Sequence, residues 1–446
     1  MNGKRIIRSV PTAEDSVVQA SSEELSPPSA KLPPPGIHYR RGLGLRKEII
    51  EPLTEDYRGH LVRFARDHDY RLRAGELRFL IAHEFGFCYG VDRAIEYAYE
   101  ARLRFPDRRI FLTGEIIHNP YVNRRLSEFG ILFLETGSPE AKFTEVGPQD
   151  VVLLPAFGVP TAELDVLRRK GSILVDTTCG SVMNVWKNVD RYKRDGFTSV
   201  VHGKYAHEET RATTSRAGTY LVVRDMAETQ DVCRYIEAGG TGGTNGGPAP
   251  LTREGFIEHF APASSPGFDP DRDLGRIGLA NQTTMLASES LEIAAVLRDS
   301  MARRYGEEEL GGRFRSFDTI CSATQERQDA VLELLREDLD LILVVGGFNS
   351  SNTANLAAIC DRKFPSYHIA GPEGLLSADE IRCRPAPGSG KGTEPVVRRG
   401  WLPEGPLRIG VTSGASTPDV MVHRTMVRVL EFRGMTEDDV QPDESF

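Results

Sequence analysis

The sequence has few features that would place the protein in a membrane, outside the cell or on a nucleic acid. The longest apolar runs, such as LILVV at 341–345, fall far short of the roughly 20 residues that a transmembrane helix needs. The N-terminus has basic residues but no apolar core, and Asp15 and the Glu pair after it come too early for a transit peptide. A net charge of −9 argues against a general nucleic-acid binder. We therefore expect a cytoplasmic protein with no membrane or nucleic-acid partner.

Cysteine is also scarce, with six residues in a chain of 446. Six cysteines are too few for a disulfide scaffold, so we expect cytosolic thiols, with some of them as candidate ligands. Apolar residues make up 39% and charged residues 27%, which is typical of soluble globular proteins. A chain of this length exceeds one small core, and two or three domains are expected.

Strand-like and helix-like segments alternate along most of the chain. LRFLIAHEF at 77–85 precedes a helical pattern, as do SILVDTTC at 172–179 and LILVVGG at 341–347. This alternation predicts βα units, parallel strands and right-handed crossovers. The expected class is α/β, with three pseudo-threefold-related modules.

Changes in composition and the positions of three cysteines divide the chain. The predicted segments are a disordered N-terminal tail at 1–36, a helical arm at 37–76, α/β modules at 77–178, 179–320 and 321–434, and an acidic C-terminal tail at 435–446. The second module carries a Gly-rich insert at 239–250 and the third a loop insert at 384–402. The first strand, 77–88, is expected to close the third module, because no other strand precedes Cys88, the first of the three cysteines.

Cys88, Cys179 and Cys321 each follow a strand-like run and precede a helix-like one. Ligands bind at the carboxyl ends of the strands in open α/β sheets, and three related modules would bring these thiolates to one centre. Soft thiolates select zinc or iron–sulfur clusters. Structural zinc usually takes four ligands, often in Cys-x-x-Cys pairs, which this chain lacks. The pattern favours a four-iron cluster with one open iron, and a zinc-stabilised binding protein remains the alternative.

The other three cysteines lie in contexts that carry no such signal. They are Cys233, Cys360 and Cys383, which we interpret as small buried hydrophobic residues.

Polar residues follow several other predicted strands. They are His118, His207, Glu209, Thr283, Thr284, Asn349, Ser350, Ser351, Asn352 and Ser416. Taken singly, a Ser or Asn at a helix start is usually a cap, worth roughly 1 kcal/mol, and a lone His is usually satisfied locally. Taken together, they lie on the same sheet edge as the cysteines. Helix N-termini, hydroxyls and imidazoles predict a cradle for a small phosphorylated substrate, with Glu209 handling protons.

Seven motifs occur in a fixed order: FGFCYGVDRAI, EIIHNPYVNRRL, HGKYAHEET, ANQTTM, CSATQERQDA, VVGGFNSSNTANL and GVTSGASTPD. This series strongly resembles the 4-hydroxy-3-methylbut-2-enyl diphosphate reductase family, also called LytB or IspH. The resemblance runs from about Leu77 to about Phe432. The N-terminal arm and LLPAFG look like the family's longer plant and cyanobacterial branch.

The resemblance implies an iron–sulfur oxidoreductase that catalyses the last step of the non-mevalonate isoprenoid pathway. Two electrons and two protons would remove the substrate's hydroxyl as water, giving isopentenyl or dimethylallyl diphosphate. By similarity, one [4Fe–4S] cluster is held by Cys88, Cys179 and Cys321. A ferredoxin- or flavodoxin-type donor is expected, because the chain has no nicotinamide or flavin fingerprint.

The resemblance also assigns the polar residues. Glu209 carries over as the proton donor, with Thr283 as a relay that also lies at the substrate. The residues that carry over as diphosphate contacts are His118, His207, Ser350, Ser351, Asn352 and Ser416.

Two positions depart from the family pattern. Phe157 stands where many bacterial members have a third histidine, so one phosphate contact is expected to be lost. Gly180-Ser181 follows Cys179 where Pro is usual, which loosens the first helical turn. PGSGKGT at 387–393 fails the phosphate-binding-loop pattern, which needs Gly at 385 and Ser or Thr at 392. A quinolinate synthase-like enzyme, another three-cysteine cluster protein, remains a further alternative.

Overall fold

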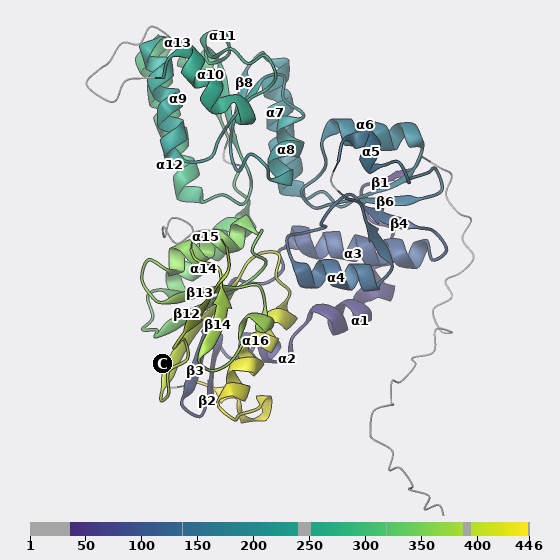
Figure 1. The fold of residues 1–446 in the computed structure, drawn as a ribbon, viewed down its shortest axis with the longest axis vertical. Helices are drawn as coiled ribbons and strands as arrows, with labels where there is room; N and C mark the ends of the chain where they lie inside the picture. Colours follow the sequence, from purple (N-terminus) through teal and green to yellow (C-terminus); the bar gives the residue numbers. More distant parts are fainter. Residues whose placement is uncertain (1–35, 136, 240–250, 318, 387–393, 445–446) are drawn as a thin grey trace, which may run out of the picture. The chain divides into compact units, whose positions relative to one another are not determined.

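The computed structural model describes residues 36–135, 137–239, 251–317, 319–386 and 394–444 (Figure 1). The predicted tail at 1–36 thus lies outside the described residues except for its last residue. Most of the Gly-rich insert at 239–250 lies outside them as well, as does the 387–393 part of the loop insert. No helix in the described stretches is both long and apolar enough to cross a membrane.

Three sheets of parallel strands form the body of the protein. Their strands are β3 (Leu77–Ile81), β4 (Ile110–Leu112), β5 (Ile131–Phe133), β6 (Val151–Leu154), β7 (Ile173–Asp176), β8 (Thr198–His202), β9 (Tyr220–Val223), β10 (Ile277–Asn281), β11 (Phe314–Ser316), β12 (Leu341–Val345), β13 (Ser366–Ile369) and β16 (Leu407–Ser413). The strand orders are β7-β6-β4-β5, β11-β10-β8-β9 and β3-β16-β12-β13. The α/β class with parallel sheets is therefore confirmed.

The three orders are the same arrangement repeated. In each sheet the strand that leads to a cysteine (β7, β11 or β3) lies beside a second strand (β6, β10 or β16), which lies beside a third (β4, β8 or β12). In the third sheet the cysteine strand comes from the N-terminal part of the chain, where Leu77 pairs with Leu407. The loops after equivalent strands therefore occupy equivalent places.

Short strands extend two of these sheets and form a separate hairpin. β1 (His38–Tyr39) runs parallel to β7. β2 (Arg71–Ala74) and β17 (Gln441–Pro442) add antiparallel strands beside β3. Within the predicted loop at 384–402, β15 (Val396–Arg399) pairs with β14 (Glu380–Cys383).

Helices connect and cover the parallel strands. They are α1 (Arg46–Tyr57), α2 (His60–Arg66), α3 (Tyr89–Arg104), α4 (Pro120–Glu128), α5 (Pro139–Lys142), α6 (Thr161–Lys170), α7 (Gly180–Arg194), α8 (Glu208–Thr214), α9 (Met226–Ala238), α10 (Arg253–Phe260), α11 (Pro270–Asp273), α12 (Ala287–Tyr305), α13 (Glu307–Arg313), α14 (Ser322–Leu334), α15 (Ser351–Cys360) and α16 (Asp419–Phe432). Every residue of β8, β10 and β12 is buried, as expected for parallel strands covered on both faces.

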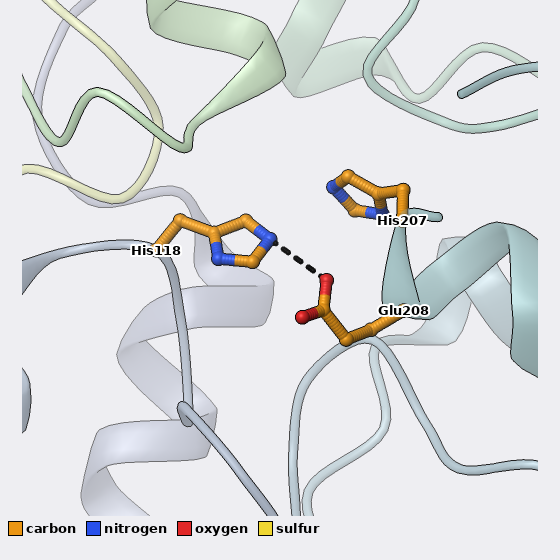
Figure 2. Close-up of side chains that lie close together, drawn as sticks. All are labelled: His118, His207 and Glu208. Atoms are coloured by element: carbon orange, nitrogen blue, oxygen red, sulfur yellow. Dashed lines mark ion pairs between the residues drawn. The ribbon is translucent and has the colours of Figure 1, made fainter. Parts of the chain in front are cut away.

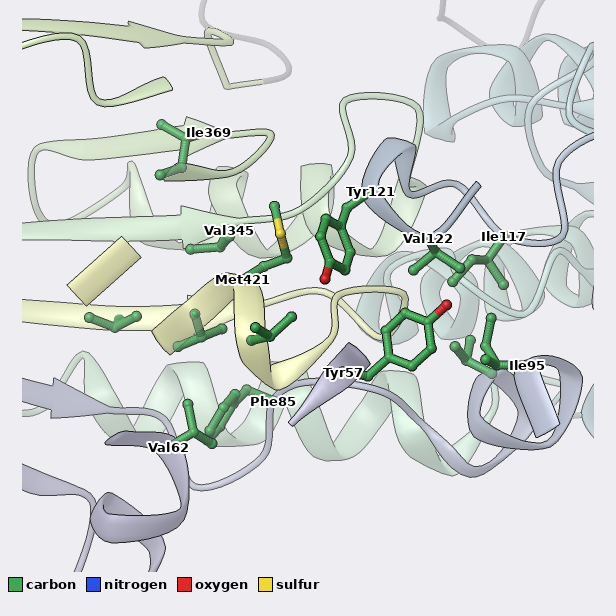
Figure 3. Close-up of a cluster of buried hydrophobic side chains, with 14 of the residues drawn as sticks. Tyr57, Val62, Phe85, Ile95, Ile117, Tyr121, Val122, Val345, Ile369 and Met421 are labelled. Carbon is green, nitrogen blue, oxygen red and sulfur yellow. The ribbon is translucent and has the colours of Figure 1, made fainter. Parts of the chain in front are cut away.

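The N-terminal arm packs on the core through α1 and α2. Tyr57 and Val62 lie in the same buried cluster as Ile95 and Met421 (Figure 3). An ion pair strengthens this packing, since Arg66 of α2 lies 2.7 Å from the buried Asp419 at the start of α16. The arm therefore supports the first and third sheets from outside the pocket described next.

Candidate active site

The predicted site residues, drawn from all three sheets, line one pocket. The pocket is lined by Cys88, Cys179, Cys321, His118, His207, Glu209, Thr283, Thr284, Ser350, Ser351, Asn352 and Ser416, among others. Asn349 is not among the lining residues. The shared strand order explains this convergence, because each sheet contributes the loops after its cysteine strand and after the next two strands beside it.

The three cysteines have the same local structure. Cys88, Cys179 and Cys321 are the N-cap residues of α3, α7 and α14. Each backbone N–H donates to a carbonyl in the loop after the neighbouring strand, namely Ala415 (3.1 Å), Ala156 (3.0 Å) and Thr283 (3.4 Å), respectively. The same hydrogen bond thus holds the backbone of each cysteine beside the pocket. Each cysteine also lies at a helix N-terminus, which favours a thiolate.

Gly90 separates two of the sulfurs. A Cβ at this position would lie 2.5 Å from the Cys179 Sγ and 3.9 Å from the Cys88 Sγ. Glycine is therefore required where the cysteines of two modules approach each other. Burial raises the pKa of Cys88, and it raises that of Cys321 to about 11, so these thiols ionise only when a metal takes the proton's place.

A buried arginine lies beside this group of thiols. Arg327 of α14 is 3% exposed and donates 2.8 Å hydrogen bonds to the carbonyls of Ala323 and Gly86. Both acceptors are neutral, and the Nε atom has no partner within the described residues. Its charge lowers the pKa of Cys88 against the larger effect of burial, so it stabilises negative charge here.

The donor set fits an iron–sulfur cluster better than a single metal ion. Four ligands of one zinc lie about 4 Å apart, given Zn–S bonds of about 2.3 Å. One ion could bind three ligand atoms of His, Cys, Asp or Glu only where all three lie close together. Among the described residues, only His118, His207 and Glu208 form a group of three such atoms within 4.8 Å of one another. The cysteine sulfurs are therefore too widely spaced for one ion, and soft thiolates from three modules suit a larger inorganic core.

His118 and His207 also line the pocket, on the loops after β4 and β8. Both are buried, with exposed fractions of 7% and 8%. Phe157 stacks on His118, with ring centroids 4.4 Å apart and planes at 22°. The Phe157 ring thus covers one face of the His118 imidazole.

Two of the lining residues have buried nitrogens that make no hydrogen bond. Within the described stretches these are His118 Nε2, whose contact with Glu208 lacks hydrogen-bond geometry, and Asn352 Nδ2. Asn352 is otherwise held through its Oδ1, which accepts from the Ala415 N–H at 2.9 Å. Unmet buried N–H groups are costly, and a bound anion would satisfy them.

The serines divide between capping and lining the pocket. Ser350 is the N-cap of α15 and accepts from the Thr353 N–H at 3.2 Å. Ser351 accepts from Gln282 Nε2 at 3.3 Å, and the Ser416 hydroxyl donates to the His118 carbonyl at 3.4 Å. Only Ser350 thus acts as the helix cap that the sequence suggested for this group.

Glu209 is the most deeply buried carboxyl in the pocket, with 1% exposed. It accepts from the Thr283 N–H at 2.7 Å and from the Thr283 hydroxyl at 3.1 Å. Burial raises the pKa of Glu209 to about 7, although both bonds favour the ionised form. A carboxyl with this pKa holds a proton at neutral pH and can release it.

Sequence reasoning missed two residues next to His118. Glu115 lies 2.7 Å from His118 Nδ1. Glu208 lies 3.3 Å from His118 Nε2. The adjacent pair HEE and the spacing of Glu115 three residues before His118 were the available signals, but only the fold brings the two motifs together.

The fold and the pocket define an α/β protein in which three thiols and several buried polar groups line one pocket. The LytB protein family matches residues 79–430, and on this match the chain belongs to that family. The 4-hydroxy-3-methylbut-2-enyl diphosphate reductase of Microcystis aeruginosa is 45% identical over 397 residues, covering 89% of this chain and 95% of that protein. That of a Synechococcus species is 47% identical, covering 88% and 93%.

A solved structure has the same fold. The E-1-hydroxy-2-methyl-but-2-enyl-4-diphosphate reductase from Plasmodium falciparum superposes with a TM-score of 0.56 at 20% identity, covering 81% of this chain and 91% of that chain. The recognised family is therefore confirmed, and the quinolinate synthase-like alternative is wrong.

Proposed function

We propose that this chain reductively removes the hydroxyl group of 4-hydroxy-3-methylbut-2-enyl diphosphate, giving isopentenyl diphosphate and dimethylallyl diphosphate. The observation that carries the proposal is the convergence of three cysteines and an anion cradle on one pocket. The reaction consumes two electrons and two protons and releases water, so the site must supply an electron carrier, a proton donor and a diphosphate anchor.

A [4Fe–4S] cluster held by Cys88, Cys179 and Cys321 is the proposed carrier. When bound, such a cluster supplies electrons one at a time and a Lewis-acidic iron. The chain's own contribution is a set of three helix N-termini and the buried charge of Arg327, all of which favour the ionised thiols.

The diphosphate is proposed to bind in the same pocket. His118, His207 and Asn352 offer N–H groups, and the hydroxyls of Ser351 and Ser416 lie beside them. Several shared donors fix the orientation of the substrate, so that its allylic end lies toward the cysteines. The Phe157 ring excludes water from one side of His118.

Glu209 is proposed to deliver a proton to the leaving hydroxyl through Thr283. Thr283 is well placed, because its hydroxyl contacts Glu209 and its carbonyl accepts from the Cys321 N–H. Burial raises the pKa of Glu209 to about 7, so part of the acid is protonated at neutral pH and can protonate a leaving group as poor as hydroxide.

The electrons are proposed to come from a ferredoxin- or flavodoxin-type protein in the cytoplasm. All six cysteines are free in the described chain, which suits a reducing compartment.

Iron and acid-labile sulfide analysis of anaerobically purified protein tests the proposal. We expect equal amounts of iron and sulfide in the wild type and a loss of most of both in Cys179→Ser. Cys360→Ala is the matched control, because Cys360 is fully buried away from the pocket. Zinc without sulfide in the wild type, or a full cluster in Cys179→Ser, would contradict the assignment.

A further inference from the structure

The anion cradle contains a carboxylate of the protein itself. Glu208, in the first turn of α8, directs its side chain toward His118 of the β4 loop (Figure 2). Its Oε2 lies 3.3 Å from His118 Nε2, and the ligand atoms of His118, His207 and Glu208 all lie within 4.8 Å of one another. Two carboxylates therefore flank one imidazole, Glu115 at Nδ1 and Glu208 at Nε2.

Hydrogen bonds show that the histidines present N–H donors here. His207 Nδ1 accepts from the Glu209 N–H at 3.1 Å, so the proton of a neutral His207 is on Nε2. His118 Nδ1 donates to Glu115 at 2.7 Å. Burial opposes a charge on His118, but the carboxylates of Glu115 and Glu208 outweigh it and raise the pKa of His118 to about 9. N–H donors bind anions, whereas a metal ion needs free lone pairs, so the proton on His207 Nε2 suits this cluster to an anion.

The two carboxylates hold His118 in different ways. The Glu115 contact is short and has hydrogen-bond geometry. The Glu208 contact is longer, and His118 Nε2 makes no proper hydrogen bond within the described residues. The Glu208 side chain is also 51% exposed, so it can turn into water without burying its charge.

We propose that Glu208 occupies the diphosphate subsite in the free protein and leaves it when a diphosphate binds. Glu115 stays in place and keeps His118 doubly protonated, so it is a positioning residue for the same anion. The identity of the anion rests on the proposed function, but the exchange of one anion for another does not. Glu208 thereby lowers the affinity for diphosphate, and it rejects ligands too weakly charged to displace a carboxylate.

Titration calorimetry of the cluster-loaded protein with inorganic pyrophosphate tests this exchange directly. We expect Glu208→Gln to bind pyrophosphate about 10-fold more tightly, because no internal anion has to be displaced. Glu115→Gln should bind about 10-fold more weakly, since it loses one charge-assisted bond that holds His118 protonated. Glu254→Gln is the control, because it removes a negative charge from the first turn of α10, outside the pocket lining.

Steady-state kinetics give a second readout, which a purely structural role would not move. Glu208→Gln should lower KM by a similar factor with kcat unchanged, as expected when only ground-state binding changes. Unchanged or weaker pyrophosphate binding in Glu208→Gln, at an unchanged melting temperature, would overturn the proposal, as would an equal tightening in Glu254→Gln. A protein that binds pyrophosphate as described but does not reduce the substrate would instead refute the proposed function alone.

Discussion

The replacement of Glu209 by glutamine separates proton delivery from every other role of this residue. In the structure one carboxylate oxygen accepts from the Thr283 N–H and the other from the Thr283 hydroxyl. Glutamine keeps one acceptor oxygen, and its NH2 group can donate to the same hydroxyl once that hydroxyl rotates. The pocket should therefore keep its shape, and the cluster and the diphosphate should still bind.

The loss of the proton donor should lower turnover by roughly 100- to 10,000-fold. The pH profile gives a sharper test than the size of the loss. Because burial raises the pKa of Glu209 to about 7, the wild-type acid is protonated below that pH and loses its proton above it. We expect wild-type turnover to fall as the pH rises through about 7, and residual turnover of Glu209→Gln to lack this descending limb.

Anaerobic turnover with a chemical reductant, measured between pH 6 and 9, is the appropriate assay. Saturating substrate keeps any change in binding out of the comparison. A Glu209→Gln enzyme that lost only twofold in turnover, or that retained the same descending limb, would refute the assignment of Glu209 as the proton donor.

Four further predictions rest on the packing and the buried charges. Gly180 has open space around its Cα and lies at the first position of α7, so Gly180→Pro should raise the unfolding free energy by roughly 0.4–1 kcal/mol in thermal melts. Gly158→Ala should lower it, because Gly158 has φ of +76° and a Cβ would meet a tryptophan ring at 2.3 Å. Arg327→Met removes a buried positive charge, so it should shift the cluster's reduction potential to a more negative value in spectroelectrochemistry. Arg303→Met, at an exposed position of α12, is the control and should leave the potential unchanged. Burial lowers the pKa of His368 to about 4, so the unfolded state takes up a proton at a higher pH than the folded state does. The free energy of unfolding should therefore fall as the pH drops from about 6.5 to 4. His368→Gln should reduce this fall by up to roughly 3 kcal/mol.

The convergence of the site could be predicted from the sequence because it depends on a local rule. Each cysteine and each polar motif follows a strand, and the carboxyl ends of parallel strands lie on one edge. The alternation of segments indicated those strands, and the pocket lining contains Cys88, Cys179 and Cys321 together. The spacing of the cysteines in the sequence did not reveal the common strand order. That order depends on pairing between β3 and β16, which lie more than 300 residues apart in the chain.

Contacts between loops from different modules could not be read from the sequence. In an extended chain, His207 and Glu209 would share a face because they are two residues apart. Instead, His207 caps α8, and both glutamates lie in its first turn. Helical geometry sends Glu209 to Thr283 and Glu208 to His118. The stacking of Phe157 on His118 likewise depends on two sheet edges that only the tertiary fold brings together.

The proposed function requires that the pocket reduces an allylic diphosphate beside Cys88, Cys179 and Cys321. The most direct test is chromatographic analysis of the products formed when anaerobic, cluster-loaded protein is incubated with 4-hydroxy-3-methylbut-2-enyl diphosphate and a chemical reductant. Our account predicts isopentenyl and dimethylallyl diphosphate, one product molecule for every two electrons consumed. Unchanged substrate in the presence of a full complement of iron and sulfide would contradict it.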